Sequence, residues 1–126
     1  MTFTALLVDD ESMVLTTLKS VFETRGFEVS TAPSAAAAAD QLSRLPFDLV
    51  VTDMRMETDT AGLEVVRRAK SQPNNPVVVI LSAFPIPATE WRKAGADTMF
   101  VKGGGIFHIL DDIERLLHDN VNPAPH

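Results

Sequence analysis

Short apolar segments alternate with amphipathic segments along the whole chain. Five segments are rich in aliphatic, β-branched or aromatic residues: 4–8, 27–31, 49–52, 77–81 and 98–101. Two stretches, 49–51 and 77–81, are continuously apolar instead of alternating with polar residues. Strands that are covered on both faces, as in parallel sheets, have this pattern. The sequence therefore predicts five strands, with the third and fourth fully buried.

Between the strands, apolar residues recur at helical spacing. Five helices are predicted, the fourth of them weakly: 11–25, 33–45, 62–71, 88–93 and 106–118. The second helix contains a run of alanines, and the flanking Leu42 and Leu45 favour a packed helix over a low-complexity segment. Regular alternation of strands and helices predicts the α/β class, with right-handed crossovers and helices on both faces of a parallel sheet. We expect a doubly wound, flavodoxin-like fold with five parallel strands in the order 2-1-3-4-5.

The length of 126 residues fits one domain with a single core. We assign residues 1–119 to this domain and residues 120–126 to a flexible C-terminal tail, which could equally be the stub of a linker. The first residues lack a basic segment, and no apolar stretch approaches membrane length. A cytoplasmic protein without a membrane partner is the expectation.

Charge and composition exclude several classes of function. The net charge is −6, with 11 basic against 17 acidic side chains, which argues against direct binding of nucleic acid. The absence of cysteine excludes disulfide and thiolate chemistry. The histidines His108, His118 and His126 show no metal-ligand spacing and are predicted to lie on the surface.

Charged residues follow three of the predicted strands. Asp9 and Asp10 follow the first strand, Asp53 the third and Lys102 the fifth. Because ligands of open parallel sheets bind at the carboxyl ends of the strands, we expect these side chains to converge. Two carboxylates about 5 Å apart repel by roughly 3 kcal/mol at an effective dielectric of ~20, so the cluster needs a cation. Mg²⁺ prefers such oxygen ligands, and the set of three acids and one ammonium indicates phosphoryl chemistry.

Asp53 is the best candidate for a nucleophile, since a carboxylate can form an aspartyl phosphate. Lys102 would then pair with a phosphoryl oxygen, and Ser82, at the end of the fourth strand, would donate a hydrogen bond to another. The bland alternatives are that Asp9 and Asp10 only cap the first helix, that Asp53 is a turn residue, and that Ser82 is an ordinary loop hydroxyl.

Two other uses of such a fold fit less well. A phosphatase of the haloacid dehalogenase class needs a second acid two residues after the nucleophile, and that position holds Arg55. A flavodoxin would hold a flavin phosphate, which the acidic crevice would repel. The run Gly103-Gly104-Gly105 matches no phosphate-binding glycine motif and is predicted to be a flexible turn.

The chain resembles the receiver domain of bacterial two-component response regulators from Leu6 to Leu117. The matching segments are Leu7-Val8-Asp9-Asp10-Glu11, Asp48-Leu49-Val50-Val51-Thr52-Asp53-Met54, Ile80-Leu81-Ser82-Ala83, Gly95-Ala96-Asp97 and Lys102. The resemblance implies Asp53 as phosphoacceptor, with Asp10 and Asp53 as direct Mg²⁺ ligands. It further implies that Asp9 acts mainly through water, that the backbone carbonyl of Arg55 completes the metal site, and that Ser82 and Lys102 contact the phosphoryl group.

The chain departs from the family pattern in three places. Gly103 stands where proline usually follows the lysine, so we expect a trans Lys102–Gly103 bond, because a cis bond without proline costs about 3–4 kcal/mol. Met99 stands at the aromatic switch position, and strand alternation turns the adjacent Phe100 to the other face. The loop after Asp53 lacks the usual proline and has one extra residue. We expect Arg55 and Glu57 to overhang the site and to change the lifetime of the phosphorylated form.

The resulting hypothesis is a stand-alone phosphoacceptor receiver in a phosphorelay, and not an ordinary enzyme. Its donor would be a sensor histidine kinase or a histidine phosphotransfer protein, and its output a contact with a downstream protein. The fourth helix, fifth strand and fifth helix would form the responding surface, and a phosphorylation-dependent homodimer could use it. The alternative is a constitutive interaction or dimerisation module with vestigial phosphorylation, which Met99 and Gly103 favour.

Overall fold

The computed structural model describes residues 2–121 and contains one parallel five-stranded sheet in the order β2-β1-β3-β4-β5. The strands are β1 (Thr4–Val8), β2 (Glu28–Ala32), β3 (Leu49–Thr52), β4 (Val77–Ser82) and β5 (Thr98–Val101). Each boundary lies within one residue of the prediction, and the predicted strand order is confirmed. The chain crosses from β1 outward to β2 and then back across β1 to β3, so β1 and β3 are neighbours at the centre of the sheet.

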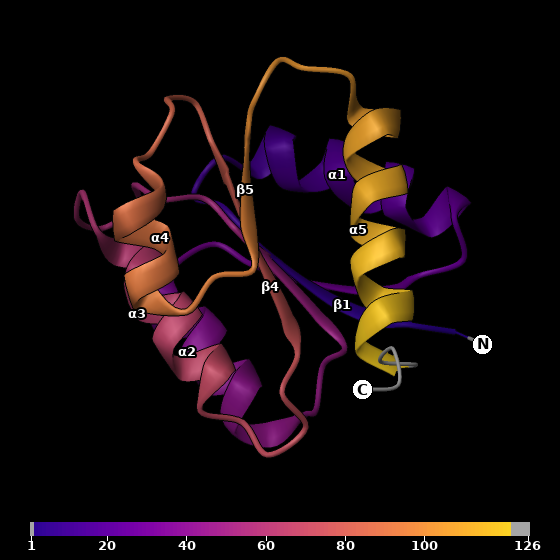
Figure 1. Cartoon of the computed structure of the whole chain (residues 1–126), viewed down its shortest axis with the longest axis horizontal. Helices are drawn as coiled ribbons and strands as arrows, with labels where there is room; N and C mark the ends of the chain where they lie inside the picture. The colour runs from indigo at the N-terminus through magenta and orange to yellow at the C-terminus, as the bar shows by residue number, and fades with distance from the viewer. Residues whose placement is uncertain (1, 122–126) are drawn as a thin grey trace.

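All five predicted helices are present and cover the two faces of the sheet. They are α1 (Ser12–Thr24), α2 (Ala35–Arg44), α3 (Ala61–Lys70), α4 (Ala88–Ala94) and α5 (Ile106–Val121). Figure 1 shows α1 and α5 on one face and α2, α3 and α4 on the other. Helix α5 continues beyond His118, so Asn120 and Val121, which we assigned to the tail, are helical. The rest of that predicted tail, residues 122–126, lies outside the described residues.

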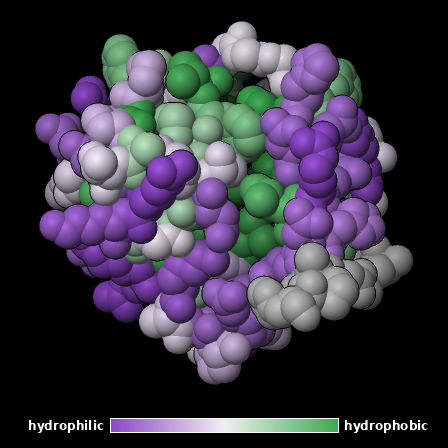
Figure 2. Space-filling view, viewed as in Figure 1, coloured by the Kyte–Doolittle hydropathy of each residue, from purple (hydrophilic) through white to green (hydrophobic). Residues whose placement is uncertain are grey.

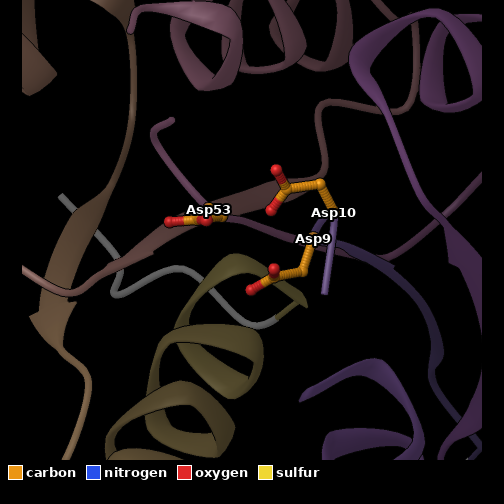
Figure 3. Close-up of side chains that lie close together, drawn as sticks. All are labelled: Asp9, Asp10 and Asp53. Carbon is orange, nitrogen blue, oxygen red and sulfur yellow. The ribbon is translucent and has the colours of Figure 1, made fainter. Parts of the chain in front are cut away.

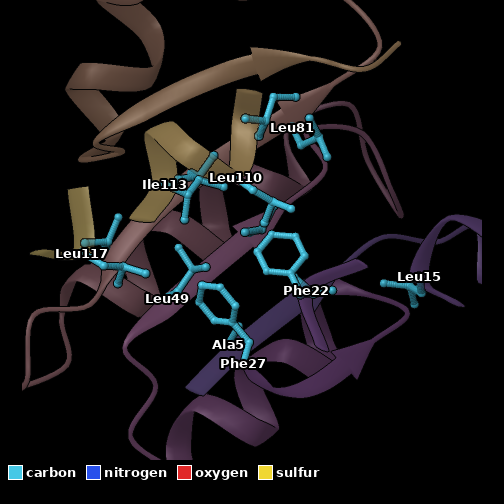
Figure 4. Close-up of a cluster of buried hydrophobic side chains, with 14 residues drawn as sticks. Ala5, Leu15, Phe22, Phe27, Leu49, Leu81, Leu110, Ile113 and Leu117 are labelled. Atoms are coloured by element: carbon cyan, nitrogen blue, oxygen red, sulfur yellow. The ribbon is translucent and has the colours of Figure 1, made fainter. Parts of the chain in front are cut away.

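Alternating side chains of each strand supply two apolar layers. In β3, Leu49 and Val51 join the layer under α1 and α5, whereas Val50 joins the layer under α2 and α3. Figure 4 shows the first layer, in which Phe22 and Leu110 meet the strand residues between α1 and α5. Both faces of β3 and β4 are therefore buried, as their continuous apolar runs predicted, and β1 is buried on both faces from Ala5 onward.

Helix α2 is a packed helix, as predicted from its alanines and leucines. Ser34 caps it by accepting a hydrogen bond from the Ala37 N–H, and Ala38 and Leu42 are buried against the sheet. The small alanine side chains allow this helix to pack closely on its neighbours. Among residues 2–121, none of the helices combines the length and apolar character that crossing a bilayer requires.

Candidate functional site

The register of β1 and β3 brings the three acids together. Val8 and Thr52 are partners in the sheet, so Asp9 and Asp53 leave adjacent strands at the same level. The Asp53 N–H donates to the Val8 carbonyl at 2.8 Å, which continues the pairing by one residue. One carboxylate oxygen from each of Asp9, Asp10 and Asp53 lies within 4.8 Å of the others. Figure 3 shows the three side chains gathered at this edge of the sheet.

Lys102 reaches the acids from the edge strand β5. Its backbone N–H donates to the Ser82 carbonyl at 2.7 Å, which continues the pairing of β5 with β4. Its Nζ lies 2.6 Å from Asp9 Oδ2 and 3.4 Å from Asp53 Oδ2. One ammonium thus faces three carboxylates, and the site keeps an excess of negative charge when all four groups are ionised.

The three acids differ in their surroundings. Asp9 is buried, and both of its oxygens are engaged, because Oδ1 accepts a hydrogen bond from the Glu11 N–H at 3.0 Å and Oδ2 binds Lys102. Asp53 is largely buried, and its Oδ1 accepts a hydrogen bond from the Met54 N–H at 2.8 Å. Asp10 is exposed. Asp10 and Asp53 therefore offer carboxylate oxygens more readily than Asp9 does.

Burial and mutual repulsion shift the protonation equilibria of the site. Burial, followed by the negative charge of Asp9, raises the pKa of Asp53, and the opposing influence of Lys102 does not cancel this. For Lys102, burial is the largest single influence and opposes the charge. The hydrogen bond to Asp9 and the charges of Asp9 and Asp53 together outweigh it and raise the pKa of Lys102. A cation bound among the acids would favour the ionised form of Asp53.

The donor set suits a hard cation such as Mg²⁺. All candidate ligands are carboxylate oxygens, with neither histidine nor cysteine beside them in the described part of the chain. Their convergence and the excess negative charge supply the attraction that such a hard cation needs. The triad consists of the three acids that the sequence predicts beside a Mg²⁺ ion. The backbone carbonyl of Arg55 as a further ligand stays a prediction.

Ser82 and Met99 lie where strand pairing predicts them. Ser82 is buried at the end of β4, and its Oγ accepts a hydrogen bond from the Phe84 N–H at 3.2 Å. Met99 is half-buried and packs on the α2–α4 side, whereas Phe100 packs on the α1–α5 side, as alternation predicted. Their switch roles stay predictions.

Arg55 and Glu57 each contact residues other than the three acids. The Arg55 guanidinium stacks on the ring of Phe84, 5.0 Å from its centroid, above the loop that follows Ser82. The Glu57 carboxylate instead accepts hydrogen bonds from the first N–H groups of α2, those of Ala35 and Ala36. These bonds lower the pKa of Glu57, and the bond from Ala35 contributes most. The sequence offered one signal for the contact with Phe84. Phe84 lies two residues after Ser82 and Arg55 two residues after Asp53, at the ends of the neighbouring strands β4 and β3.

The loop after Lys102 follows the expectation for a chain without proline there. The described residues contain no cis peptide bond, so Lys102–Gly103 is trans. Gly103 has φ of 91°, a left-handed conformation that favours glycine. All three glycines of the run are exposed.

Comparison with known sequences shows one family along nearly the whole fold. The sequence model described as "Response regulator receiver domain" matches residues 5–114. Sporulation initiation phosphotransferase F of Bacillus subtilis is 30% identical over 114 residues, which cover 89% of this chain and 91% of that protein. The alginate biosynthesis transcriptional regulatory protein AlgB of Pseudomonas putida is 40% identical over 99 residues. That match covers 77% of this chain, but the chain spans only 22% of the length of AlgB.

Solved structures agree on the fold. A CheY-like response regulator receiver domain protein of Methanospirillum hungatei superposes with a TM-score of 0.89 at 21% identity and covers 98% of this chain and 100% of its own. The response regulator protein TrrA of Thermotoga maritima, solved in complex with Mg(2+)-BeF, gives 0.80 at 24% identity and covers 90% and 98%. With its acidic triad at the family's position in the fold, the chain belongs to the response regulator receiver domain family, whose members act in two-component signalling and not as ordinary enzymes.

Proposed function

We propose that Asp53 accepts a phosphoryl group from a phosphohistidine on a partner protein. The observation that carries this proposal is the position of Asp53 beside Asp10 and Lys102, at the end of a fully buried central strand. In the transfer, a carboxylate oxygen of Asp53 attacks phosphorus and forms the new P–O bond. The P–N bond breaks, and its electron pair stays on the imidazole nitrogen of the donor, which is then protonated.

The surrounding residues would stabilise the transferred group. The Lys102 Nζ lies 3.4 Å from Asp53 Oδ2, so a small movement would bring it to a phosphoryl oxygen. Its ion pair with Asp9 Oδ2, at 2.6 Å, keeps it at the site. The Ser82 hydroxyl accepts from Phe84 and keeps its own O–H to donate. Asp10 and Asp53 would hold Mg²⁺ directly, with the Arg55 carbonyl, and Asp9 would contribute through water. The bound cation would neutralise charge that builds up on the phosphoryl oxygens.

Arg55 and Phe84 would modulate the lifetime of the phosphorylated form. They belong to the loops that follow β3 and β4, and their stacking connects these two loops. An exposed cation over an aromatic ring contributes only about 0.5–1 kcal/mol, so Arg55 can leave Phe84 for a phosphoryl oxygen at small cost. Glu57 would act more remotely, through the loop itself.

The donor protein would bind beside α1. A groove of about 360 Å³ runs from α1 to the glycine turn, and Lys102 lies at one end of it. Its walls are mainly apolar, and Met13 on its rim is 82% exposed. An apolar rim next to the phosphoacceptor suits a protein partner, such as a sensor histidine kinase or a histidine phosphotransfer protein.

The downstream partner would bind the surface of α4, β5 and α5, through which a phosphorylation-dependent homodimer would also form. Figure 2 shows apolar side chains between the hydrophilic surfaces of α4 and α5, over β5, where Val101 is 39% exposed. Met99 would couple this surface to the phosphoacceptor. A cytoplasmic location fits such a relay.

The decisive experiment is intact mass after incubation with Mg²⁺ and acetyl phosphate. We expect the wild type and the Asp59→Asn control to gain one phosphoryl group and Asp53→Asn to gain none. No adduct on the wild type, together with no Mg²⁺ binding by calorimetry, would replace this proposal with the constitutive interaction module that Met99 and Gly103 favour.

The donor surface has a separate test. Met13→Glu places a charge on the groove without touching the acids, so phosphorylation by acetyl phosphate should keep its rate. Transfer from a protein phosphohistidine donor should slow at least about tenfold, the effect of losing one interface anchor of roughly 1.4 kcal/mol. Equal slowing with both donors would contradict the placement of the donor here.

A further inference from the structure

Glu57 ties the loop after the phosphoacceptor to a distant helix. Its Oε1 accepts a hydrogen bond from the Ala35 N–H at 2.9 Å, and its Oε2 accepts one from the Ala36 N–H at 3.3 Å. These partners are more than 20 residues away in the chain, at the start of α2. A carboxylate at a helix N-terminus is favoured by both the free N–H groups and the helix dipole.

The contact completes the capping of α2. An α-helix leaves its first four N–H groups without partners inside the helix. In α2, Glu57 accepts from Ala35 and Ala36, and the Ser34 hydroxyl accepts from Ala37. The Ala38 N–H then makes the first regular helical bond, to the Ser34 carbonyl. Without Glu57, the N–H groups of Ala35 and Ala36 would lose their protein partner.

The same loop is fixed on both sides of Arg55. On one side, the Gly62 N–H donates to the Met54 carbonyl at 2.8 Å, directly beside the phosphoacceptor. On the other side, Met56 packs half-buried against the α2–α4 apolar layer, and Glu57 follows it onto α2. The Arg55 peptide thus lies between two fixed parts of the loop. Of the contacts that fix them, only that of Glu57 with α2 is made by a polar side chain.

We infer that Glu57 is a positioning residue of the metal site. By holding the loop on α2, it sets where the Arg55 peptide lies relative to Asp10 and Asp53, and thereby the affinity for Mg²⁺. Glu57 itself touches neither the metal ligands nor the phosphoryl group. This inference rests on the proposed function, since it assigns the Arg55 carbonyl and the two carboxylates to one cation.

Thermodynamic reciprocity adds a consequence at a distance. If the contact of Glu57 with α2 strengthens metal binding, then metal binding must strengthen that contact by the same factor. The N–H groups of Ala35 and Ala36 should therefore exchange with solvent more slowly when Mg²⁺ is bound, although α2 carries none of the proposed ligands. Exchange at other α2 residues, such as Leu42, should be unaffected.

The test compares Glu57→Ala and Glu57→Gln with the control Asp59→Ala, in the full chain. Asp59 is an exposed acid of the same loop, so its removal changes the net charge equally. Calorimetry with Mg²⁺ alone should show that Glu57→Ala weakens binding about tenfold, the low end of the effect of outer-shell partners. Glu57→Gln keeps one acceptor oxygen and should lose about threefold, by the same reasoning. Asp59→Ala should bind as the wild type does.

A second readout needs no metal. In the metal-free protein, hydrogen exchange followed by NMR should accelerate at Ala35 and Ala36 in Glu57→Ala, but not in Asp59→Ala.

A third readout uses saturating Mg²⁺. Under this condition, the rate at which acetyl phosphate phosphorylates Glu57→Ala should return to that of the wild type. This separates positioning from loss of the fold.

The outcomes distinguish the two proposals. If the wild type binds no Mg²⁺, the proposed metal site fails. If the wild type binds Mg²⁺ and Glu57→Ala or Glu57→Gln binds it equally well, with exchange at Ala35 and Ala36 changed, the contact exists but does not position the site, and only this inference is overturned. Should the alanine variant not fold, the glutamine variant and its exchange rates decide alone.

Discussion

The central strands and the β5 edge of the same sheet are built in opposite ways. Every residue of β3 is buried, and α3 buries five residues against it and its neighbours. No residue of β5 is fully buried, and α4, which covers it on one face, buries none. Few buried contacts mean a low free energy of local opening. The acids therefore stand on the rigid region, and the proposed output surface lies on the region that can change at small cost.

Lys102 is the link between these two regions. It belongs to the edge strand β5, yet its Nζ binds carboxylates at the ends of β1 and β3. A charge added at Asp53 acts directly on this link. Substitutions in the two regions and at Lys102, compared by their effect on stability, test whether the central strands are more rigid than the β5 edge.

The largest effect should come from Gly62→Ala in the rigid region. A Cβ there would clash with the Asp53 carbonyl oxygen and lie 2.7 Å from the Met54 Cα, both backbone atoms that the central strand holds in place. Overpacking usually costs 1–3 kcal/mol, and we expect more than about 3 kcal/mol here because neither neighbour can rotate away. Urea denaturation measures the loss. A cost below about 1 kcal/mol, the average for single substitutions, would mean that the end of β3 is not rigid.

Lys102→Ala should cut the link between the regions. Breaking a buried pair by removing one partner costs roughly 3–5 kcal/mol, and we expect about 2 kcal/mol because Lys102 keeps some exposure. Its pKa is raised in the folded state, so its stabilising contribution is present below its ordinary pKa and lost as the pH rises through the higher folded value.

Denaturation of Lys102→Ala at neutral and at strongly alkaline pH checks both points. The exposed Lys19→Ala serves as the control for loss of one positive charge. A cost for Lys102→Ala that is the same at both pH values would show that the charge of Lys102 is not what connects β5 to the acids.

Gly103→Ala tests the loop that follows the link. Open space surrounds a Cβ at this position, but φ of 91° strains any side chain, and we expect a loss of about 1 kcal/mol from the backbone alone. The neighbouring Gly104→Ala meets only the Val101 carbonyl at 3.6 Å and has no positive φ, so it should change the stability by less than about 0.5 kcal/mol. Equal losses from both variants, measured by thermal unfolding, would rule out the left-handed turn at Gly103.

Asp53→Asn should stabilise the metal-free protein slightly. Burial and then the charge of Asp9 raise the pKa of Asp53, so the folded state gives up this proton less readily than the unfolded state. Stability is therefore lost as the pH rises from the ordinary value through the raised one, and the neutral amide avoids that loss. We expect a gain of less than about 1 kcal/mol at pH 7 that disappears in acid, where both forms are neutral. A gain that persists in acid would indicate a cause other than charge.

Much of the fold could be predicted because its pattern is local. The continuous apolar runs of β3 and β4 record burial on both faces, and alternation placed Met99 and Phe100 on opposite sides of β5. The acids could be predicted to converge because parallel strands all end at one edge. The end of α5 was predicted too early, at residue 118, because the single exposed Val121, four residues after Leu117, is a weak apolar signal.

Contacts between loops were beyond the sequence. The stacking of Arg55 on Phe84 and the binding of Glu57 to α2 depend on the directions in which three loops leave the sheet, and an exposed polar residue has no pattern that announces its partner. The contacts of Asp9 could not be predicted either. Its two buried oxygens accept hydrogen bonds from the Glu11 N–H and from Lys102 Nζ.

The sequence by itself thus determined the positions of the strands, the two apolar faces and the identity of the acids, because periodicity and strand ends are written in consecutive residues. Only the tertiary structure decided which acid is buried, where Lys102 binds most closely, and that the loop beside Asp53 is anchored on α2. These are matters of a few ångströms between segments distant in the chain. The packing of the whole sheet sets such distances, and no local pattern encodes them.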